Sequence, residues 1–139
     1  MIELLAVLAI ISALATIAIP AVQDAVERAR VARAIGDIRA LETDLEGLDS
    51  LPPDLASVGR GSMLDPWGNP YQYLRFPTRG HGVPQGARRD RFLVPVNTSY
   101  DLYSMGPDGA SQAPFSAKAS RDDIVRANDG GYIGLASRF

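Results

Sequence analysis

The sequence contains no cysteine and a single histidine, His81, among its 139 residues. Without cysteine the chain forms no disulfide bond and has neither a thiol nucleophile nor a thiolate metal ligand. His81 lies in a glycine-rich stretch, and we expect it to form neither a catalytic triad nor a zinc site. Ser104 lies in a strand-like run without the glycine elbow of a serine nucleophile. The composition therefore argues against thiol, zinc and serine-hydrolase chemistry.

The net charge of the chain is also small, and one long segment carries no charged side chain. The 14 Lys and Arg residues nearly balance the 16 Asp and Glu residues, which leaves a net charge of −2. This balance does not indicate a nucleic-acid-binding surface, so we expect no nucleic-acid partner. Between Glu3 and Asp24 the sequence holds no charged side chain at all. A lone carboxylate at the start of such an apolar run requires an explanation.

The apolar run is long enough to cross a lipid bilayer as a helix. Residues 4–22 are all apolar or small, and at roughly 1.5 Å per residue they extend about 28 Å. The alternative is a cleaved signal segment, but the run lacks its basic start and small-residue exit. We therefore expect residues 1–23 to span a membrane. Pro20 removes one backbone hydrogen bond, which predicts a kink or a locally melted turn.

The helix is expected to continue to residue 50 with a different character. Its apolar residues recur every three or four positions, which is typical of one buried helix face. They are Val31, Ile35, Ile38, Leu41, Leu45 and Leu48. Glycine lowers the stability of a helix, so Gly36 indicates either that another backbone approaches the helix closely there or that the helix tolerates this loss. Pro52 and Pro53 end the helix, because proline disfavours helical geometry in the preceding residue.

Residues 51–139 read as one small domain. Three segments rich in aromatic and branched residues are predicted strands: 71–76, 90–96 and 99–105. Polar, glycine-containing loops are expected at 77–90 and 106–120, and a short helix is expected to begin at residue 121 and end before Gly131. The predicted fold class is α+β, with the long N-terminal helix packed on one face of a small antiparallel sheet.

Several of these segments resemble one protein family. The run IELLAVLAIISALATIAIP is similar to the N-terminal helix of type IV pilins and type II secretion pseudopilins. That helix carries one glutamate near its start and a proline about seventeen residues later, the places that Glu3 and Pro20 occupy. The segments DPWGNPYQY (65–73), YDLYSMGPDG (100–109) and DDI (122–124) resemble the major pseudopilin of type II secretion. The loop 77–90 departs from the usual pattern and indicates a distinct subfamily.

The resemblance implies a structural subunit of a pilin-like filament and no enzyme. Such a subunit is stored in the inner membrane as a single-pass protein. It then polymerises into a helical homo-oligomer, either a periplasmic pseudopilus for protein export or an extracellular filament. Its implied partners are the inner-membrane assembly machinery and minor pseudopilins. The family's mature chain begins Phe-Thr, two residues before the position of Met1, after a short basic leader that ends in glycine. Neither is in this sequence, so we expect a truncated or misassigned start, which leaves leader processing and N-methylation open.

A second class of function stays open, namely a monomeric, membrane-tethered periplasmic domain that binds a ligand or catalyses a reaction. Glu3 favours the filament subunit, because a carboxylate has no evident role in a plain membrane anchor. In family filaments this glutamate meets the N-terminal amine of a neighbouring subunit and sets the register. The alternative is that Glu3 merely escapes to the membrane interface, because a carboxylate in hydrocarbon costs on the order of 3 kcal/mol. In a filament, the resemblance also predicts an extended or broken segment at Pro20.

A calcium site is the second expectation that the resemblance carries. Calcium takes six to eight oxygen ligands in a flexible loop, and major pseudopilins bind it in the region that matches residues 105–123. The implied ligands are the Met105 carbonyl and the carboxylates of Asp108, Asp122 and Asp123. The residues also allow an alternative, in which Asp108-Gly109 forms an ordinary turn and Ser120 to Asp123 form a helix-capping box.

Two further features carry weaker expectations. Trp67, within DPWGNP, is interpreted as an anchor of the core or of its loop and not as a ligand platform. The basic run ARRDR (87–91) is interpreted as a solvated edge, with contact to an acidic partner as the alternative.

Overall fold

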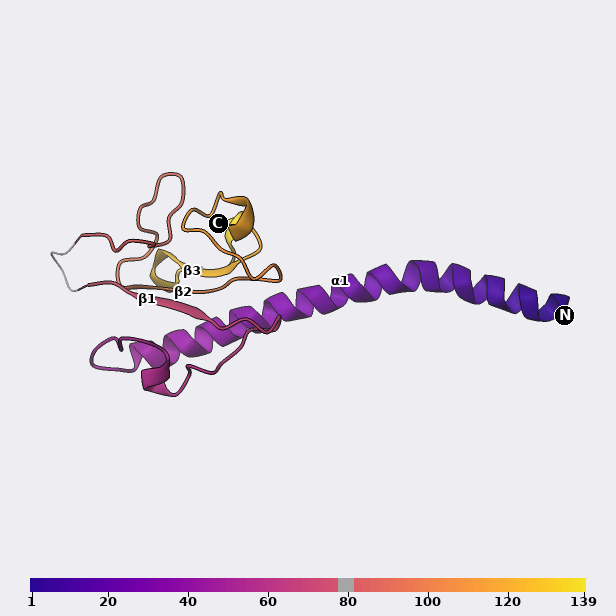
Figure 1. The fold of residues 1–139 in the computed structure, drawn as a ribbon, viewed down its shortest axis with the longest axis horizontal. Helices are drawn as coiled ribbons and strands as arrows, with labels where there is room; N and C mark the ends of the chain where they lie inside the picture. Colours follow the sequence, from indigo (N-terminus) through magenta and orange to yellow (C-terminus); the bar gives the residue numbers. More distant parts are fainter. Residues whose placement is uncertain (78–81) are drawn as a thin grey trace. The chain divides into compact units, whose positions relative to one another are not determined.

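The computed structural model describes residues 1–77 and 82–139, so the expectations for His81 lie outside the described residues. One helix, α1, spans Ile2–Glu46, and four strands follow it along the chain (Figure 1). The strands are β1 (Gln72–Arg75), β2 (Tyr100–Ser104), β3 (Ile124–Ala127) and β4 (Tyr132–Leu135). The chain divides into two compact units, Met1–Arg30 and Val31–Phe139, and α1 contributes to both.

The first unit is the apolar half of α1. It provides the one helix among the described residues that is long and apolar enough to cross a membrane. The hydroxyls of Ser12 and Thr16 donate to the backbone carbonyls four residues earlier, each at 2.8 Å. These bonds keep the polar groups satisfied within the helix, as an apolar solvent requires. Helical structure continues through Pro20, so the locally melted turn expected there is not formed in the single subunit.

The second half of α1 packs into the second unit through the predicted apolar face. Its four fully buried positions lie three or four residues apart, so that they share one side of the helix. They are Ala34, Ile38, Leu41 and Leu45. Val31 and Ile35 pack against the margin of this core. Leu48 lies beyond the end of the helix and is 44% exposed, so its inclusion in the buried face was wrong.

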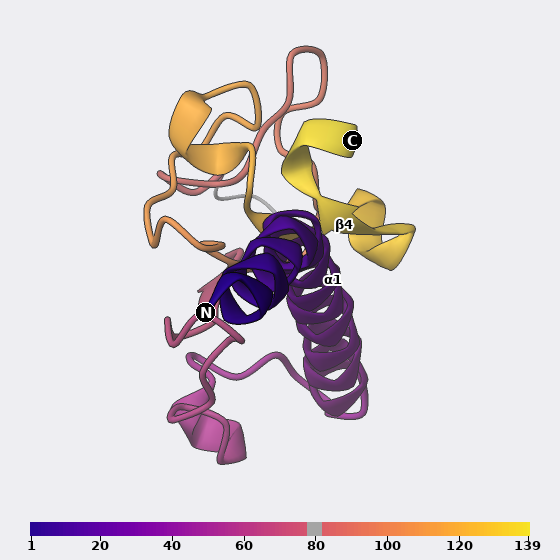
Figure 2. The same cartoon turned by 90° about the vertical axis from the view of Figure 1, so that its right-hand side faces the viewer.

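The four strands form one antiparallel sheet in the order β1-β2-β3-β4. Tyr73 pairs with Leu102, Tyr103 with Val125, and Arg126 with Ile133. The second half of α1 lies along one face of this sheet (Figures 1 and 2). The predicted α+β class and the strands within 71–76 and 99–105 are therefore confirmed.

The strand expected at 90–96 is wrong. This segment folds back on itself, because Asp90 and Leu93 exchange backbone hydrogen bonds at 3.0 and 3.3 Å. Phe92 at the tip of the turn is 96% exposed. Pro95 has no backbone N–H to offer to a neighbouring strand. The β-branched and aromatic composition of the segment therefore indicated a strand that its local backbone bonding does not allow.

The short helix expected from residue 121 is also wrong. The segment forms β3, whose backbone pairs with β2 on one side and β4 on the other. The turn between β3 and β4 contains three successive residues with positive φ, namely Asn128, Asp129 and Gly130. Asparagine, aspartate and glycine tolerate this conformation best. Pairing on both edges outweighs the local helix propensity of the sequence.

The sheet separates two cores, because successive side chains of a strand point to opposite faces. On the α1 side, Tyr100 and Leu102 of β2 and Ile124 of β3 complete the core that the helix begins. On the other side, Val125 and Ala127 form a second core. Its cover comes from the loops that precede β2 and β3, through Val96 and Phe115 respectively, and from Ala136 after β4. These two loops contain the residues that matter most for the candidate metal site.

The turn DPWGNP is organised by a buried carboxylate. Asp65 Oδ1 accepts the backbone N–H groups of Trp67 and Asn69 at 3.0 and 2.8 Å. Its other oxygen accepts the Ser104 hydroxyl at 2.5 Å, which ties the turn to β2. Trp67 packs against the core on the α1 side. The interpretation of Trp67 as a core anchor is therefore confirmed.

Candidate functional site

The first candidate site is the exposed apolar helix with its single carboxylate. Glu3 lies in the first turn of α1, where a negative charge is favourable beside the unpaired N–H groups of the helix end. The large apolar side chains from Ile2 to Val22 are all at least half exposed in the single subunit. An apolar surface of this extent requires a membrane or other apolar helices around it. The assembly roles of Glu3 and Pro20 stay predictions, because they concern more than one subunit.

The second candidate site is the loop that follows β2. Met105 and Asp122 are half-buried, and Asp108 is exposed. Asp108 Oδ1 accepts the backbone N–H of Ala110 at 2.9 Å, which is the turn expected at Asp108-Gly109. Asp122 Oδ2 accepts the Asp108 backbone N–H in a long bond of 3.4 Å. The Asp122 carboxylate thus holds the two ends of the loop together.

Gly106 explains how closely the two ends approach. Its φ is +65°, and a Cβ atom built on it would lie 2.5 Å from the backbone carbonyl oxygen of Asp122. Both the conformation and the contact require glycine. The sequence therefore uses Gly106 to bring the start of the loop onto the segment that leads into β3.

Asp123 has a different environment from the other two carboxylates. It is fully buried, and its Oδ2 atom accepts hydrogen bonds from Arg88 Nη2 and Ser111 Oγ, both at 2.5 Å. Burial raises the pKa of Asp123, although the bonds from Ser111 and Arg88 counteract this. The helix-capping alternative for Asp123 is wrong, because the segment after it is a strand.

These residues offer a calcium ion too few free oxygen ligands. Within residues 1–77 and 82–139, no three His, Cys, Asp or Glu side chains converge as a metal site. Asp108 is engaged in its own turn, and Asp123 is paired with a guanidinium. The Oδ1 atom of Asp123 is buried without a hydrogen-bond partner, but one free oxygen is far short of six to eight. In this arrangement the residues do not fit calcium, and calcium binding stays an untested prediction.

Arg88 is the residue that sequence reasoning placed wrongly. The run 87–91 was expected to be a solvated edge, but the Arg88 side chain is only 2% exposed, whereas Arg89 and Arg91 are exposed. Its Nη1 atom donates to Ser111 Oγ and, at 2.6 Å, to the Gln112 carbonyl. The guanidinium lies 4.3 Å from the centre of the Tyr103 ring. The only signal in the sequence was that Asp122 and Asp123 carry the charge opposite to that of the basic run 87–91. No spacing rule connects these two segments.

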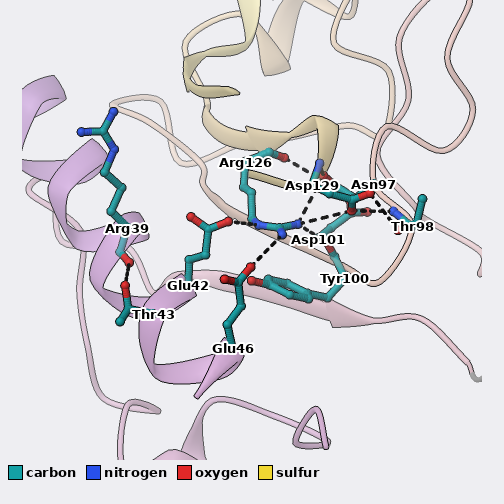
Figure 3. Close-up of polar contacts among 10 residues, drawn as sticks. All are labelled: Arg39, Glu42, Thr43, Glu46, Asn97, Thr98, Tyr100, Asp101, Arg126 and Asp129. Atoms are coloured by element: carbon teal, nitrogen blue, oxygen red, sulfur yellow. Dashed lines mark hydrogen bonds and ion pairs between the residues drawn. The ribbon is translucent and has the colours of Figure 1, made fainter. Parts of the chain in front are cut away.

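A second buried arginine, Arg126 of β3, lies on the opposite face of the sheet from Val125 and Arg88, and Figure 3 shows its polar contacts. Its Nε atom is 2.6 Å from Glu42 Oε1, and its Nη2 atom is 3.5 Å from Glu46 Oε1, both on α1. Its guanidinium lies 4.1 Å from the centre of the Tyr100 ring. Sequence reasoning missed this cluster. The available signal was the pair of glutamates four residues apart beside the buried face of α1.

Asp101 and Asn97 connect the two arginines. Asp101 Oδ2 accepts the Arg88 backbone N–H at 2.6 Å, and its Oδ1 accepts the Asn97 amide at 2.8 Å. The same amide also donates to the Arg126 carbonyl at 3.0 Å. Both residues are fully buried, and burial raises the pKa of Asp101. The loop before β2 is therefore part of a continuous polar network and not a surface addition.

Comparison with known proteins finds a relative that matches most of the chain. The type II secretion system core protein G of Pseudomonas aeruginosa is 31% identical to this chain in an alignment over 134 residues, and the match covers 78% of this chain and 82% of that protein. No protein-family model and no solved structure matches the chain.

Proposed function

The chain belongs to the pilin-like family of the type II secretion system core protein G, the major pseudopilin, and on this basis we propose how it works. It is a structural subunit of a pilin-like filament of type II secretion. The observation that carries this function is the exposed apolar half of α1, which is continuous with the helix that the folded domain packs on. A subunit of this form has one segment for the membrane or a filament core and another for the filament surface.

Before assembly, residues 1–23 anchor the subunit in the inner membrane, and the domain projects into the periplasm. The length and hydropathy of the segment support this location. On assembly the apolar helices leave the lipid and pack against one another, which covers the same surface with protein instead. The membrane and the filament core are therefore two alternative apolar environments for one helix.

Glu3 selects the correct neighbour in this filament. A carboxylate buried among apolar helices needs a cation, and the N-terminal amine of an adjacent subunit supplies one. The inner-membrane assembly machinery and minor pseudopilins are the further partners that we propose. The subunit acts by polymerising and has no catalytic activity of its own.

The test is filament yield in the secretion system from which the chain comes. Glu3→Gln and Glu3→Leu should still insert into the membrane, because both side chains are less costly there than glutamate. Their filament yield in the sheared cell fraction, seen by negative-stain microscopy, should fall sharply. Glu27→Gln, a half-exposed carboxylate on the same helix, is the matched control and should assemble normally.

Two outcomes would contradict the proposal at different levels. Normal filaments from both Glu3 variants would exclude the role of Glu3 as a selector. A parent chain that is recovered only as detergent-soluble monomer, with the remaining secretion components present, would exclude the filament function itself.

A further inference from the structure

The loop after β2 and the segment before β3 are joined by a charged side chain from a third part of the chain. Arg88 bonds Ser111 and Gln112 of the loop and Asp123 beside β3 at the same time. A structural calcium ion would make the same connection. We propose that the Arg88 guanidinium is a built-in cation that takes the structural place of a divalent metal ion, so that the folded domain does not depend on calcium.

The contacts of Arg88 account for its charge. Its side chain is 2% exposed and that of Asp123 is fully buried, so neither charge is solvated by water. A buried carboxylate is stable only with a cation and hydrogen bonds beside it. Arg88 provides both, at 2.5 Å from Asp123 Oδ2, and Ser111 adds a third group to the cluster. The negative charge of Asp123 is therefore already neutralised within the chain.

The surroundings favour arginine over any mobile cation. The guanidinium lies over the Tyr103 ring at 4.3 Å and near the Phe115 ring at 5.2 Å. A flat, weakly hydrated guanidinium stacks on aromatic faces more readily than a compact ammonium or a hydrated metal ion does. A metal ion bound to Asp123 would be repelled by the positive charge next to it. Calcium could occupy the cluster only after Arg88 had been displaced.

The backbone on both sides of Arg88 holds it in place. Its N–H donates to Asp101 at 2.6 Å, and its carbonyl accepts the Val96 N–H at 3.0 Å. Arg89 exchanges backbone bonds of 3.0 and 2.9 Å with Ala113 and Phe115 of the loop after β2. Arg88 is thus inserted by a fixed segment of backbone and is not a surface side chain that happened to fold inwards. The unusual loop before β2 supplies this cation.

The experiment uses the full chain in detergent micelles, stripped of metal and checked by elemental analysis. Thermal unfolding is followed by the near-ultraviolet circular dichroism of Trp67, and calcium binding by titration calorimetry. The melting temperature of the parent should be the same with millimolar EGTA and with millimolar calcium chloride, and calorimetry should detect no calcium binding. A rise of several degrees with calcium, or stoichiometric binding, would overturn the proposal.

Three variants separate the built-in cation from a metal site. Arg88→Gln leaves Asp123 buried without its cation and should lower the melting temperature by roughly 10 °C or more. Arg89→Gln is the matched control, since only its backbone makes the described contacts, and should melt like the parent. If Arg88→Gln melts like Arg89→Gln, the proposal is wrong.

Asp108→Asn keeps the result decisive even if Arg88→Gln does not fold. Asparagine preserves the turn to Ala110 but weakens a calcium ligand. A built-in cation predicts that Asp108→Asn melts close to the parent in both calcium and EGTA. A calcium site predicts that the parent gains stability with calcium and that this variant loses the gain. Because these measurements concern folding alone, the filament function can fail without affecting them, and the reverse also holds.

Discussion

The Arg126 cluster allows a sharp prediction about the joint between α1 and the sheet. Arg126 is 2% exposed and Glu42 16% exposed, whereas Glu46 is 58% exposed. Removing one partner of a buried ion pair costs about 3–5 kcal/mol, because the other charge is left buried. In Glu42→Ala, Glu46 and Asp129 remain 3.5 and 3.7 Å from the guanidinium and offset part of that loss. We therefore expect Glu42→Ala to lower the free energy of unfolding by about 3 kcal/mol.

Glu46→Ala is the matched control, because Glu46 lies one helical turn from Glu42 and pairs with the same arginine. Its exposed pair with Arg126 is worth less than about 1 kcal/mol. Urea denaturation of the full chain in micelles, read from Trp67, measures both changes. With a slope of about 1–3 kcal/mol per molar urea, the Glu42→Ala midpoint should fall by at least about 1 M.

A third variant tests whether the loss comes from the unpaired charge. The double change of Glu42→Leu with Arg126→Met replaces the pair by apolar side chains and should recover much of the stability, because no buried charge is left alone. Equal losses for Glu42→Ala and Glu46→Ala, or a double variant as unstable as the sum of its single changes, would refute the reasoning.

Two further predictions concern the α1 side of the domain. Tyr71 is buried and its hydroxyl donates to Asp37 Oδ2 at 2.9 Å; burial, followed by the bond to Asp37 and its charge, raises the pKa of Tyr71. The stability that the protonated Tyr71 hydroxyl contributes is present below about pH 10 and is lost as the pH rises towards the folded-state pKa. Above about pH 10 the free energy of unfolding should therefore fall by up to about 1.4 kcal/mol per pH unit because of Tyr71, and Tyr71→Phe should remove this part of the fall. Urea midpoints between pH 9 and 11 measure this, and an unchanged slope would count against it. Nothing lies within 4 Å of the place of a Cβ on Gly36, so Gly36→Ala should stabilise the subunit by about 0.5–1 kcal/mol; a lower urea midpoint would show that the site is not open.

The parts of this fold that follow local rules could be predicted from the sequence. The buried face of α1 could be predicted because helical periodicity places Ile38, Leu41 and Leu45 on one side of the helix, whatever they pack against. The strands β1 and β2 were readable from their aromatic and branched residues and from the turn formers before β1. The family resemblance added the order of these elements.

The parts that depend on distant partners could not be predicted. Residues 121–127 have no local signal that separates a helix from a strand, and pairing with β2 and β4 decides the outcome. Arg88 and Asp123 are 35 positions apart, and nothing in either segment indicates the other. A charged run is ordinarily solvated, so the burial of one arginine out of three in residues 87–91 was outside the reach of a composition rule.

The pairing of Glu42 with Arg126 spans 84 positions of the chain, and this separation has a consequence for synthesis. While the ribosome is still adding the middle of the protein, α1 is complete, but its carboxylate has no cation and its apolar face has no sheet. β3, which supplies both Arg126 and Ile124, is translated only after all of the chain between it and α1. A chain that stops early therefore cannot close its domain at all. Until β3 has been synthesised, the domain therefore has no finished surface to present to an assembly partner.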